Sequence, residues 1–215
     1  MRLLYATTNQ AKLESMRRIT KILGVEIIGL NELKKLSEFA NVQLPQIDET
    51  GNNPLENAII KARAYYDTLK IPLFSCDSGL YFDDLDASLQ PGTHVRRVNG
   101  AELTDMQMVE YYADLAHKNG GKLKARYKNA ICLILDEQNI FTCMDESLEI
   151  PPFYMVSTPH PVIVKGFPLD SLSVDIATGK YYQDMQDNLA VDKDTIEIGF
   201  ANFFSYYILV IKCLF

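Results

Sequence analysis

One short apolar run, Pro72-Leu73-Phe74-Ser75-Cys76, limits the folds open to this chain more than any other segment. It is too short for a helix and is bounded by proline and by a Ser-Gly pair, which predicts a buried strand. Asp77 then stands where that strand is expected to stop, and Gly79 allows a sharp turn or a close approach to a ligand. Because ligands of α/β sheets bind at strand ends, Asp77 is a candidate functional carboxylate. The alternative is that Asp77-Ser78-Gly79 is only a turn, for which these residue types are also typical.

A second junction of strand and helix lies at the start of the chain. Leu3-Leu4-Tyr5-Ala6 is predicted to be a strand, Thr7-Thr8-Asn9 a polar loop, and Ala11 onward a helix, since apolar residues recur there at helical spacing. Such a junction brings backbone N–H groups and the positive end of a helix to one place, which suits a phosphate, with Lys12 beside it. The alternative is that a loop residue merely caps the helix.

The segment around residue 50 predicts a second candidate site. Asn53-Pro54-Leu55-Glu56 marks the start of a helix, because Asn can cap it, Pro suits its first position and Glu56 stands where a capping box needs it. Asn57 and Lys61 are four residues apart and share a face of that helix. They are either functional or part of a solvated polar stripe. Glu49 precedes this helix and stands two residues before Gly51.

The rest of the chain alternates between strand and helix patterns. Strands are predicted at residues 25–30, 125–136 and 139–144. A helix is predicted at residues 104–115, and the turn that terminates it at Asn119-Gly120-Gly121. With 215 residues and 47% hydrophobic content, the chain can bury a sizeable core as one α/β domain over residues 1–215. The apolar run at 203–215 is shorter than the roughly 20 residues needed to cross a bilayer, so it predicts a closing core element.

Charge and cysteine content exclude several classes of protein. The net charge of −7 argues against a broad nucleic-acid surface, so any phosphate chemistry must be local. The four cysteines lack metal-site or disulfide spacing, which favours reduced thiols and a cytoplasmic protein. Cys76 has no neighbouring histidine to generate a thiolate, so it is expected to be a structural strand residue. His94 has no second ligand at metal-site spacing, so it is expected to be structural or at the surface. No export signal and no membrane association are expected.

Five short motifs recur in the order and spacing of one known family. They are Ala6-Thr7-Thr8-Asn9 with Lys12, Glu49-Thr50-Gly51, Glu56-Asn57-Ala58 with Lys61, Asp77-Ser78-Gly79-Leu80, and Pro91-Gly92 with Arg97. Over residues 3 to 100 the sequence resembles the inosine triphosphate pyrophosphatases of the Ham1-like family. The resemblance weakens in the C-terminal half.

The resemblance implies a fold, a reaction and a set of site residues. The fold would be α/β, an elongated mixed β-sheet with flanking helices and two lobes around a central cleft, and the protein a homodimer. The reaction would be the Mg2+-dependent hydrolysis of non-standard purine nucleoside triphosphates (ITP, dITP, XTP) to monophosphate and pyrophosphate. Asp77 would be the general base and, with Glu49, a metal ligand, which suits the attack of water on phosphorus. The implied substrate contacts are Thr7, Thr8, Asn9, Lys12, Asn57, Lys61, Ser78, Gly79, Arg97, Phe167, Asp170 and Lys193.

The chain departs from the family pattern at three places. Cys76 replaces an acid, which predicts weaker metal binding or slower turnover. Leu169 replaces an aromatic residue, and Pro168 a glycine, in the segment that reads the base, where Phe167 could still stack on a purine. The late S-H-R motif aligns with Glu197-Ile198-Gly199, so a phosphate-binding arginine is missing. Two alternatives therefore stay open: the same chemistry on another nucleotide, and a degenerate nucleotide-binding paralogue with little activity.

Overall fold

The computed structural model describes residues 2–83, 85–98, 100–185 and 191–214, and in the last of these ranges the side chains of 196–207. The chain forms two compact units. The first comprises Met1–Ser78, Asn129–Leu148 and Thr195–Phe215, and the second comprises Gly79–Lys128 and Glu149–Asp194. Strands β3 (Leu73–Phe82) and β6 (Lys122–Ile134) contribute residues to both units. That the units together form one domain stays a prediction.

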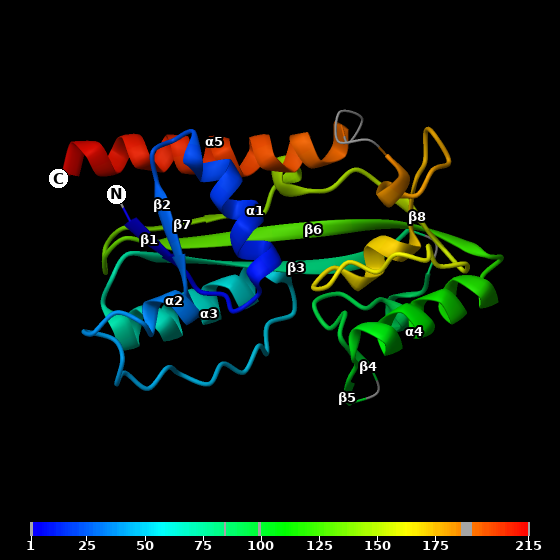
Figure 1. Cartoon of the computed structure of the whole chain (residues 1–215), viewed down its shortest axis with the longest axis horizontal. Coiled ribbons are helices and arrows are strands. Elements are labelled where there is room, and N and C mark those ends of the chain that lie inside the picture. The colour runs from blue at the N-terminus through cyan, green and yellow to red at the C-terminus, as the bar shows by residue number, and fades with distance from the viewer. Residues whose placement is uncertain (1, 84, 99, 186–190, 215) are drawn as a thin grey trace. The chain divides into compact units, whose positions relative to one another are not determined.

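A mixed sheet organises the first unit. Strand β1 (Arg2–Tyr5) pairs in parallel with β2 (Glu26–Gly29) on one side and with β3 on the other. The order is β2-β1-β3-β6, and β7 (Ile140–Cys143) pairs antiparallel with β6. Helices α1 (Gln10–Lys21), α2 (Leu30–Leu33), α3 (Pro54–Leu69) and α5 (Val191–Leu214) flank the sheet (Figure 1). The predicted mixed α/β fold with flanking helices is confirmed.

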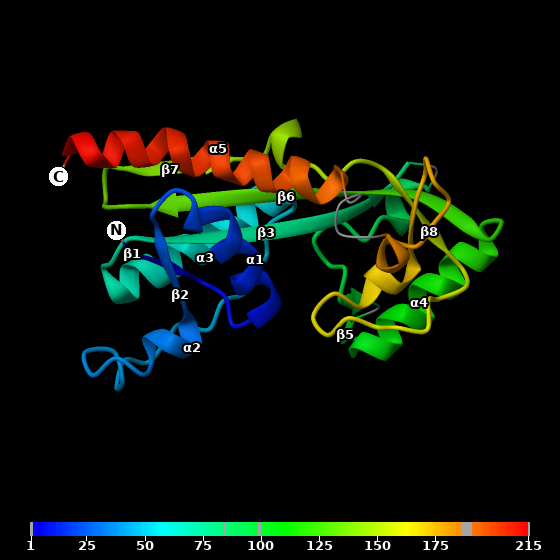
Figure 2. The ribbon, with the colours of Figure 1, turned by 45° about the horizontal axis from the view of Figure 1, so that its top comes forward.

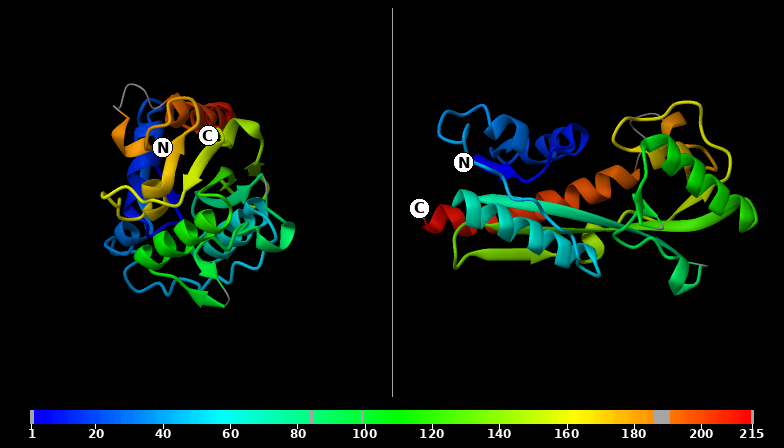
Figure 3. Two further views of the ribbon diagram at one scale, coloured as in Figure 1. Left: turned by 90° about the vertical axis from the view of Figure 1, so that its right-hand side faces the viewer. Right: turned by 90° about the horizontal axis from the view of Figure 1, so that it is seen from below.

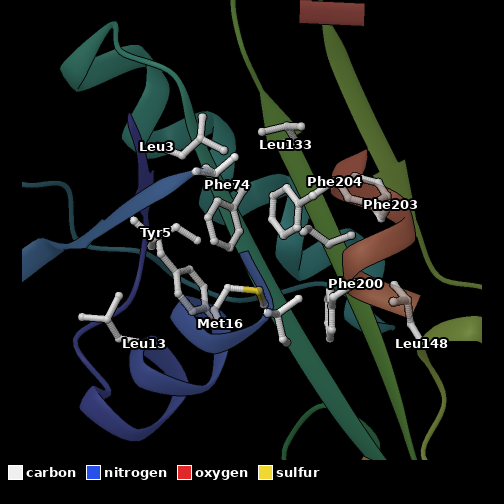
Figure 4. Close-up of a cluster of buried hydrophobic side chains, with 14 of the residues drawn as sticks. Leu3, Tyr5, Leu13, Met16, Phe74, Leu133, Leu148, Phe200, Phe203 and Phe204 are labelled. Carbon is white, nitrogen blue, oxygen red and sulfur yellow. The ribbon is translucent and has the colours of Figure 1, made fainter. Parts of the chain in front are cut away.

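The two faces of this sheet carry different cores because side chains alternate along each strand. On one face Tyr5 stacks on Phe74 with ring centroids 4.5 Å apart, and Phe204 of α5 meets Phe74 edge-on at 5.1 Å (Figure 4). On the other face Ala58 and Ala62 of α3 are fully buried, and their small side chains let the helix lie close to the sheet (Figure 3). The predicted burial of the C-terminal segment is confirmed for Phe203 and Phe204 of α5, whereas Tyr206 is 68% exposed.

The outer edge of β2 is covered by side chains. Arg17 donates hydrogen bonds from Nε and Nη2 to the Ile27 carbonyl oxygen, both at 3.0 Å, and its guanidinium also binds Glu32 at 2.5 Å. Glu32 in turn accepts the Gly29 N–H at 3.1 Å. The ion pair therefore satisfies one acceptor and one donor of the edge strand, which would otherwise be open to pairing with another strand.

The second unit packs one long helix on a smaller sheet. The N-terminal part of β6 pairs antiparallel with β8 (Phe153–Val156), and β8 pairs antiparallel with β9 (Ser173–Asp175). Helix α4 (Asp105–Lys118) lies beside β8 in Figure 2 and buries Tyr112 and Ala116 in the core of this unit. A two-stranded sheet of β4 (Arg97–Val98) and β5 (Ala101–Glu102) and the short 3-10 helices η1 (Ala87–Leu89), η3 (Pro168–Leu172) and η4 (Tyr182–Asp184) complete it. Helix η2 (Glu146–Leu148) belongs to the first unit.

Local signals in the sequence located the starts of α3 and α4 correctly. Asn53 caps α3, since its side-chain oxygen accepts the Glu56 N–H at 2.9 Å, and Thr104 caps α4 in the same way. The hairpin of β6 and β7 is also confirmed. No helix in the described part of the chain combines the length and apolar character needed to cross a membrane.

The expected end of a strand at Asp77 is wrong. Strand β3 is ten residues long and runs through both Asp77 and Gly79 without a turn. Gly79 is needed for close packing instead: a Cβ there would lie 2.8 Å from the Tyr81 ring and 3.1 Å from the Gly92 carbonyl oxygen. The next residue, Leu80, exchanges two backbone hydrogen bonds with Gly92, so another backbone comes close at this point, as glycine in a strand interior often indicates.

Candidate active site

Asp77 is the buried carboxylate at the centre of a polar cluster in the first unit. Its side chain lies on the α3 face of the sheet and is 9% exposed. The Asn57 Nδ2 atom donates a hydrogen bond to Asp77 Oδ2 at 3.1 Å. Burial raises the pKa of Asp77 above its usual value; Lys61 opposes this effect, Glu49 adds to it, and Asn57 and Lys12 also oppose it. A carboxylate with a raised pKa beside cations is suited to accept a proton.

Lys61 and Glu49 form an ion pair next to this carboxylate. The Lys61 amino group lies 2.5 Å from a carboxylate oxygen of Glu49, and the side chains are 17% and 34% exposed respectively. Lys61 stands one helical turn after Asn57, so the shared face predicted for the two residues is confirmed. A solvated stripe does not describe this face, because Asn57 is only 1% exposed.

The loop that precedes α1 is fixed largely by its own hydrogen bonds. Asn9 Oδ1 accepts the N–H groups of Ala11 at 2.9 Å and Lys12 at 3.2 Å, so Asn9 is the helix cap. Thr7 Oγ1 accepts the Asn9 N–H at 3.1 Å. Among the described residues, the hydroxyl of Thr8 and the amino group of Lys12 make no hydrogen bond or ion pair, and Lys12 is close enough to lower the pKa of Asp77. These two groups are thus available to an anionic ligand.

Ser78 and Cys76 point away from Asp77, since neighbouring residues of a strand face opposite sides of the sheet. The Ser78 hydroxyl donates to Asn129 Oδ1 at 2.7 Å, and Asn129 Nδ2 donates to the Leu148 carbonyl oxygen at 2.8 Å. Burial raises the pKa of Cys76 to about 12, which supports its interpretation as a structural strand residue. Asn129 was missed by sequence reasoning; its one signal is a polar residue at the head of the apolar run 130–135.

Five of the predicted site residues belong to the second unit. They are Gly79, Arg97, Phe167, Asp170 and Lys193. The Arg97 side chain is exposed and makes no ion pair within the described part of the chain, whereas Arg96 binds Asp105 at 2.7 Å and is structural. Phe167 immediately precedes η3, and Asp170 lies within it. The side chain of Lys193 lies outside the described residues.

The positions that depart from the family pattern have structural roles in this chain. Leu169 is 3% exposed and packs in the core of the second unit. In α5 of the first unit, Glu197 pairs with Arg18 of α1 at 3.5 Å. Gly199 packs so tightly that a Cβ would lie 1.9 Å from the Ser147 carbonyl oxygen. These contacts explain why neither a large nor a cationic side chain stands at Gly199.

The carboxylates of the first unit suit a metal ion that is shared with a ligand. Within the described ranges, no group of three or more His, Cys, Asp or Glu side chains could enclose a metal ion. Glu49 and Asp77 nevertheless supply two hard oxygen ligands, close enough that Glu49 helps to raise the pKa of Asp77. Mg2+ is commonly held by one or two carboxylates together with water and substrate phosphates. The donor set therefore fits Mg2+ bound jointly with a phosphate compound.

Two similar curated proteins are both named dITP/XTP pyrophosphatase. The dITP/XTP pyrophosphatase of Aquifex aeolicus is 39% identical over 97 residues, which cover 45% of this chain and 42% of that protein. The dITP/XTP pyrophosphatase of Symbiobacterium thermophilum is 33% identical over 135 residues, which cover 62% and 61% respectively. The chain thus spans less than two thirds of the length of these two relatives.

Solved structures and a family model complete the comparison. The HAM1 protein from Coxiella burnetii shares the fold with a TM-score of 0.69 at 20% identity, over 96% of this chain and 99% of that one. The Ham1 protein of Staphylococcus aureus gives 0.68 at 18% identity, over 96% and 100%. The Ham1 family model matches residues 3–148, which is more than half of the chain. The family resemblance in the sequence is confirmed, and the chain belongs to the Ham1 family.

Proposed function

We propose that this protein is a nucleoside triphosphate pyrophosphatase that hydrolyses non-standard purine nucleoside triphosphates such as ITP, dITP and XTP to monophosphate and pyrophosphate. The observation that carries the proposal is a buried Asp77 with a raised pKa beside Lys61, Lys12 and Glu49. The relatives named dITP/XTP pyrophosphatases support the choice of substrate.

Asp77 is the general base in this proposal. It takes a proton from the water that attacks phosphorus, and its raised pKa makes it a better proton acceptor than an ordinary carboxylate. Lys12, Lys61 and Thr8 contact phosphate oxygens and stabilise the negative charge that develops there. Such local cations are needed because a chain with net charge −7 repels a polyanionic substrate at long range.

Glu49 and Asp77 would hold Mg2+ together with the phosphates. When bound, Mg2+ would neutralise negative charge on the phosphate oxygens and help to orient the reacting groups. Cys76 adds no ligand on this side of the sheet, because its side chain faces the opposite core and its thiol is protonated at neutral pH. The weaker Mg2+ binding expected from the lost acid at position 76 rests on the family pattern and stays a prediction.

The remaining site assignments stay predictions. Contacts of the substrate with Thr7, Asn9, Asn57, Ser78, Gly79, Arg97, Phe167, Asp170 and Lys193 rest on the family resemblance. We also propose a cytoplasmic homodimer on the same basis; light scattering after size-exclusion chromatography tests the dimer.

The test is release of pyrophosphate with Mg2+ from ITP, dITP, XTP and the ordinary nucleoside triphosphates, for the native protein and for Asp77→Asn. We expect inosine or xanthine nucleotides to react fastest and the variant to lose about 10²- to 10⁴-fold in kcat, the usual contribution of a general base. Asp67→Asn is the matched control, since Asp67 is 75% exposed on α3.

Other results would point to the alternatives. A different nucleotide reacting fastest would keep the chemistry and change the substrate. Binding without any hydrolysis would replace the proposal with a nucleotide-binding protein. Undiminished turnover in Asp77→Asn would remove Asp77 as the base.

A further inference from the structure

We propose that Asn57 is a positioning residue whose carboxamide fixes Asp77 and the segment that carries Glu49 relative to each other. Its effect on turnover rests on the function proposed above, whereas its effect on the segment 49–51 does not.

The orientation of the Asn57 amide follows from the chemistry of its two partners. The Gly51 N–H can only donate, so the atom that faces it at 2.7 Å must be the amide oxygen, Oδ1. The amide nitrogen then faces Asp77 Oδ2 at 3.1 Å. Both ends of the side chain are thus bonded within the protein.

The burial of Asn57 favours this role over the direct substrate contact that the family resemblance implies. Only 1% of the residue is exposed, and its two partners occupy the amide oxygen and one amide hydrogen. Asp77 Oδ1, in contrast, has no hydrogen bond among the described residues. Asn57 therefore holds one oxygen of the carboxylate and leaves the other for a proton.

The backbone at Gly51 is shaped to accept this amide. A Cβ at Gly51 would lie 2.6 Å from Asn57 Oδ1 and 2.7 Å from Glu56 Cβ. Only glycine lets the backbone come close enough to α3 for the hydrogen bond to form. Two contacts then attach the segment to α3: Gly51 with Asn57, and Glu49 with Lys61.

Asn57 is the one described side chain that bonds both to this segment and to Asp77. Its loss would let the carboxylate rotate and let the segment with Glu49 move, while Lys12 and Lys61 would remain to bind phosphate. A displacement of about 1 Å in a catalytic group can cost about 10²-fold in rate. The expected signature is therefore a fall in kcat with little change in KM for the nucleotide.

The experiment compares Asn57→Leu, which keeps the branching and the number of heavy atoms but removes both hydrogen bonds, with the native protein. We expect kcat to fall about 10²-fold, KM to change less than about 3-fold, and hydrogen exchange of the Gly51 amide to speed up about 10-fold or more. Asn52→Ala is the matched control, because Asn52 is exposed and adjacent to Gly51. It should change none of the three quantities.

A second variant keeps the proposal testable if Asn57→Leu does not fold. The double variant Asn57→Asp with Asp77→Asn preserves an acceptor for the Gly51 N–H and a hydrogen bond between the two side chains, but moves the carboxylate. We expect slow exchange at Gly51 and lost turnover.

Two results would overturn the inference. One is slow Gly51 exchange in Asn57→Leu, or fast exchange in the double variant, which would show that Asn57 does not hold the segment. The other is fast exchange in Asn57→Leu with unchanged kcat, which would show that the tether does not position the reacting groups. If the native protein hydrolyses no nucleotide, the proposed function fails separately, and the exchange of Gly51 still decides whether Asn57 holds the segment.

Discussion

Replacing Gly199 by alanine in α5 probes the packing at the position where the family pattern has an arginine. The new Cβ would lie 1.9 Å from the carbonyl oxygen and 2.8 Å from the carbonyl carbon of Ser147. Both are backbone atoms, so neither a side-chain rotation nor a small adjustment relieves the overlap. Helix α5 or the segment before Leu148 has to move.

The expected magnitude combines two opposing contributions to the free energy of unfolding. On an exposed helix, Gly→Ala stabilises by about 1 kcal/mol because alanine is the better helix former. Overpacking in a dense core costs about 1–3 kcal/mol and in some cases more, and an overlap with backbone belongs at or above the upper end. We expect a net loss of about 2 kcal/mol, which lowers Tm by about 4–8 °C in a chain of this length.

Thermal and urea unfolding followed by circular dichroism measure this change. Ile198→Ala is the control, since Ile198 is the neighbouring residue and is 58% exposed, and its effect should stay within about 0.5 kcal/mol. Gly199→Arg, which restores the family residue, should destabilise more than alanine does. A Gly199→Ala protein as stable as the native one would refute the packing argument.

Two further predictions follow from charges in the first unit. Burial raises the pKa of Asp77 in the folded state above its value in the unfolded state. The native fold therefore loses stability as the pH rises from the unfolded-state pKa through the folded-state pKa. Asp77→Asn should therefore have a higher Tm than the native protein at pH 7. Below about pH 3, where Asp77 is largely protonated in both the folded and the unfolded state, the two Tm values should be the same. An equal Tm at pH 7 would contradict this prediction. Arg17→Leu uncovers the Ile27 carbonyl at the edge of β2 and should cause self-association, seen by light scattering, that is absent from the exposed control Arg18→Leu. A monodisperse Arg17→Leu protein at the native mass would contradict the proposed role of the ion pair.

Much of the fold could be predicted because the relevant signals are local. A helix cap depends on residues within one turn, so Asn53 and Thr104 marked the starts of α3 and α4. The alternation of apolar runs and polar breaks located β1, α1 and the hairpin of β6 and β7 for the same reason. The five short motifs between residues 3 and 100 were sufficient to place the chain in its family.

Prediction from the sequence was wrong where the local preference of the residues and their long-range packing disagree. Asp, Ser and Gly favour turns, which led to the wrong expectation that β3 ends at Asp77. The approach of the Gly92 backbone to Leu80 keeps that segment extended instead. No property of residues 75–79 alone could show this contact.

The sequence by itself determined several of the helices and strands, the caps at the starts of α3 and α4, and the family. The tertiary structure alone decided which face of the sheet each side chain of β3 occupies, and hence that Asp77 meets Asn57 while Ser78 meets Asn129. It also decided that Gly51 and Gly199 are there for close packing against other segments. The physical reason is that these contacts join residues far apart in the chain, and strand register, which a local pattern does not contain, sets which of them meet.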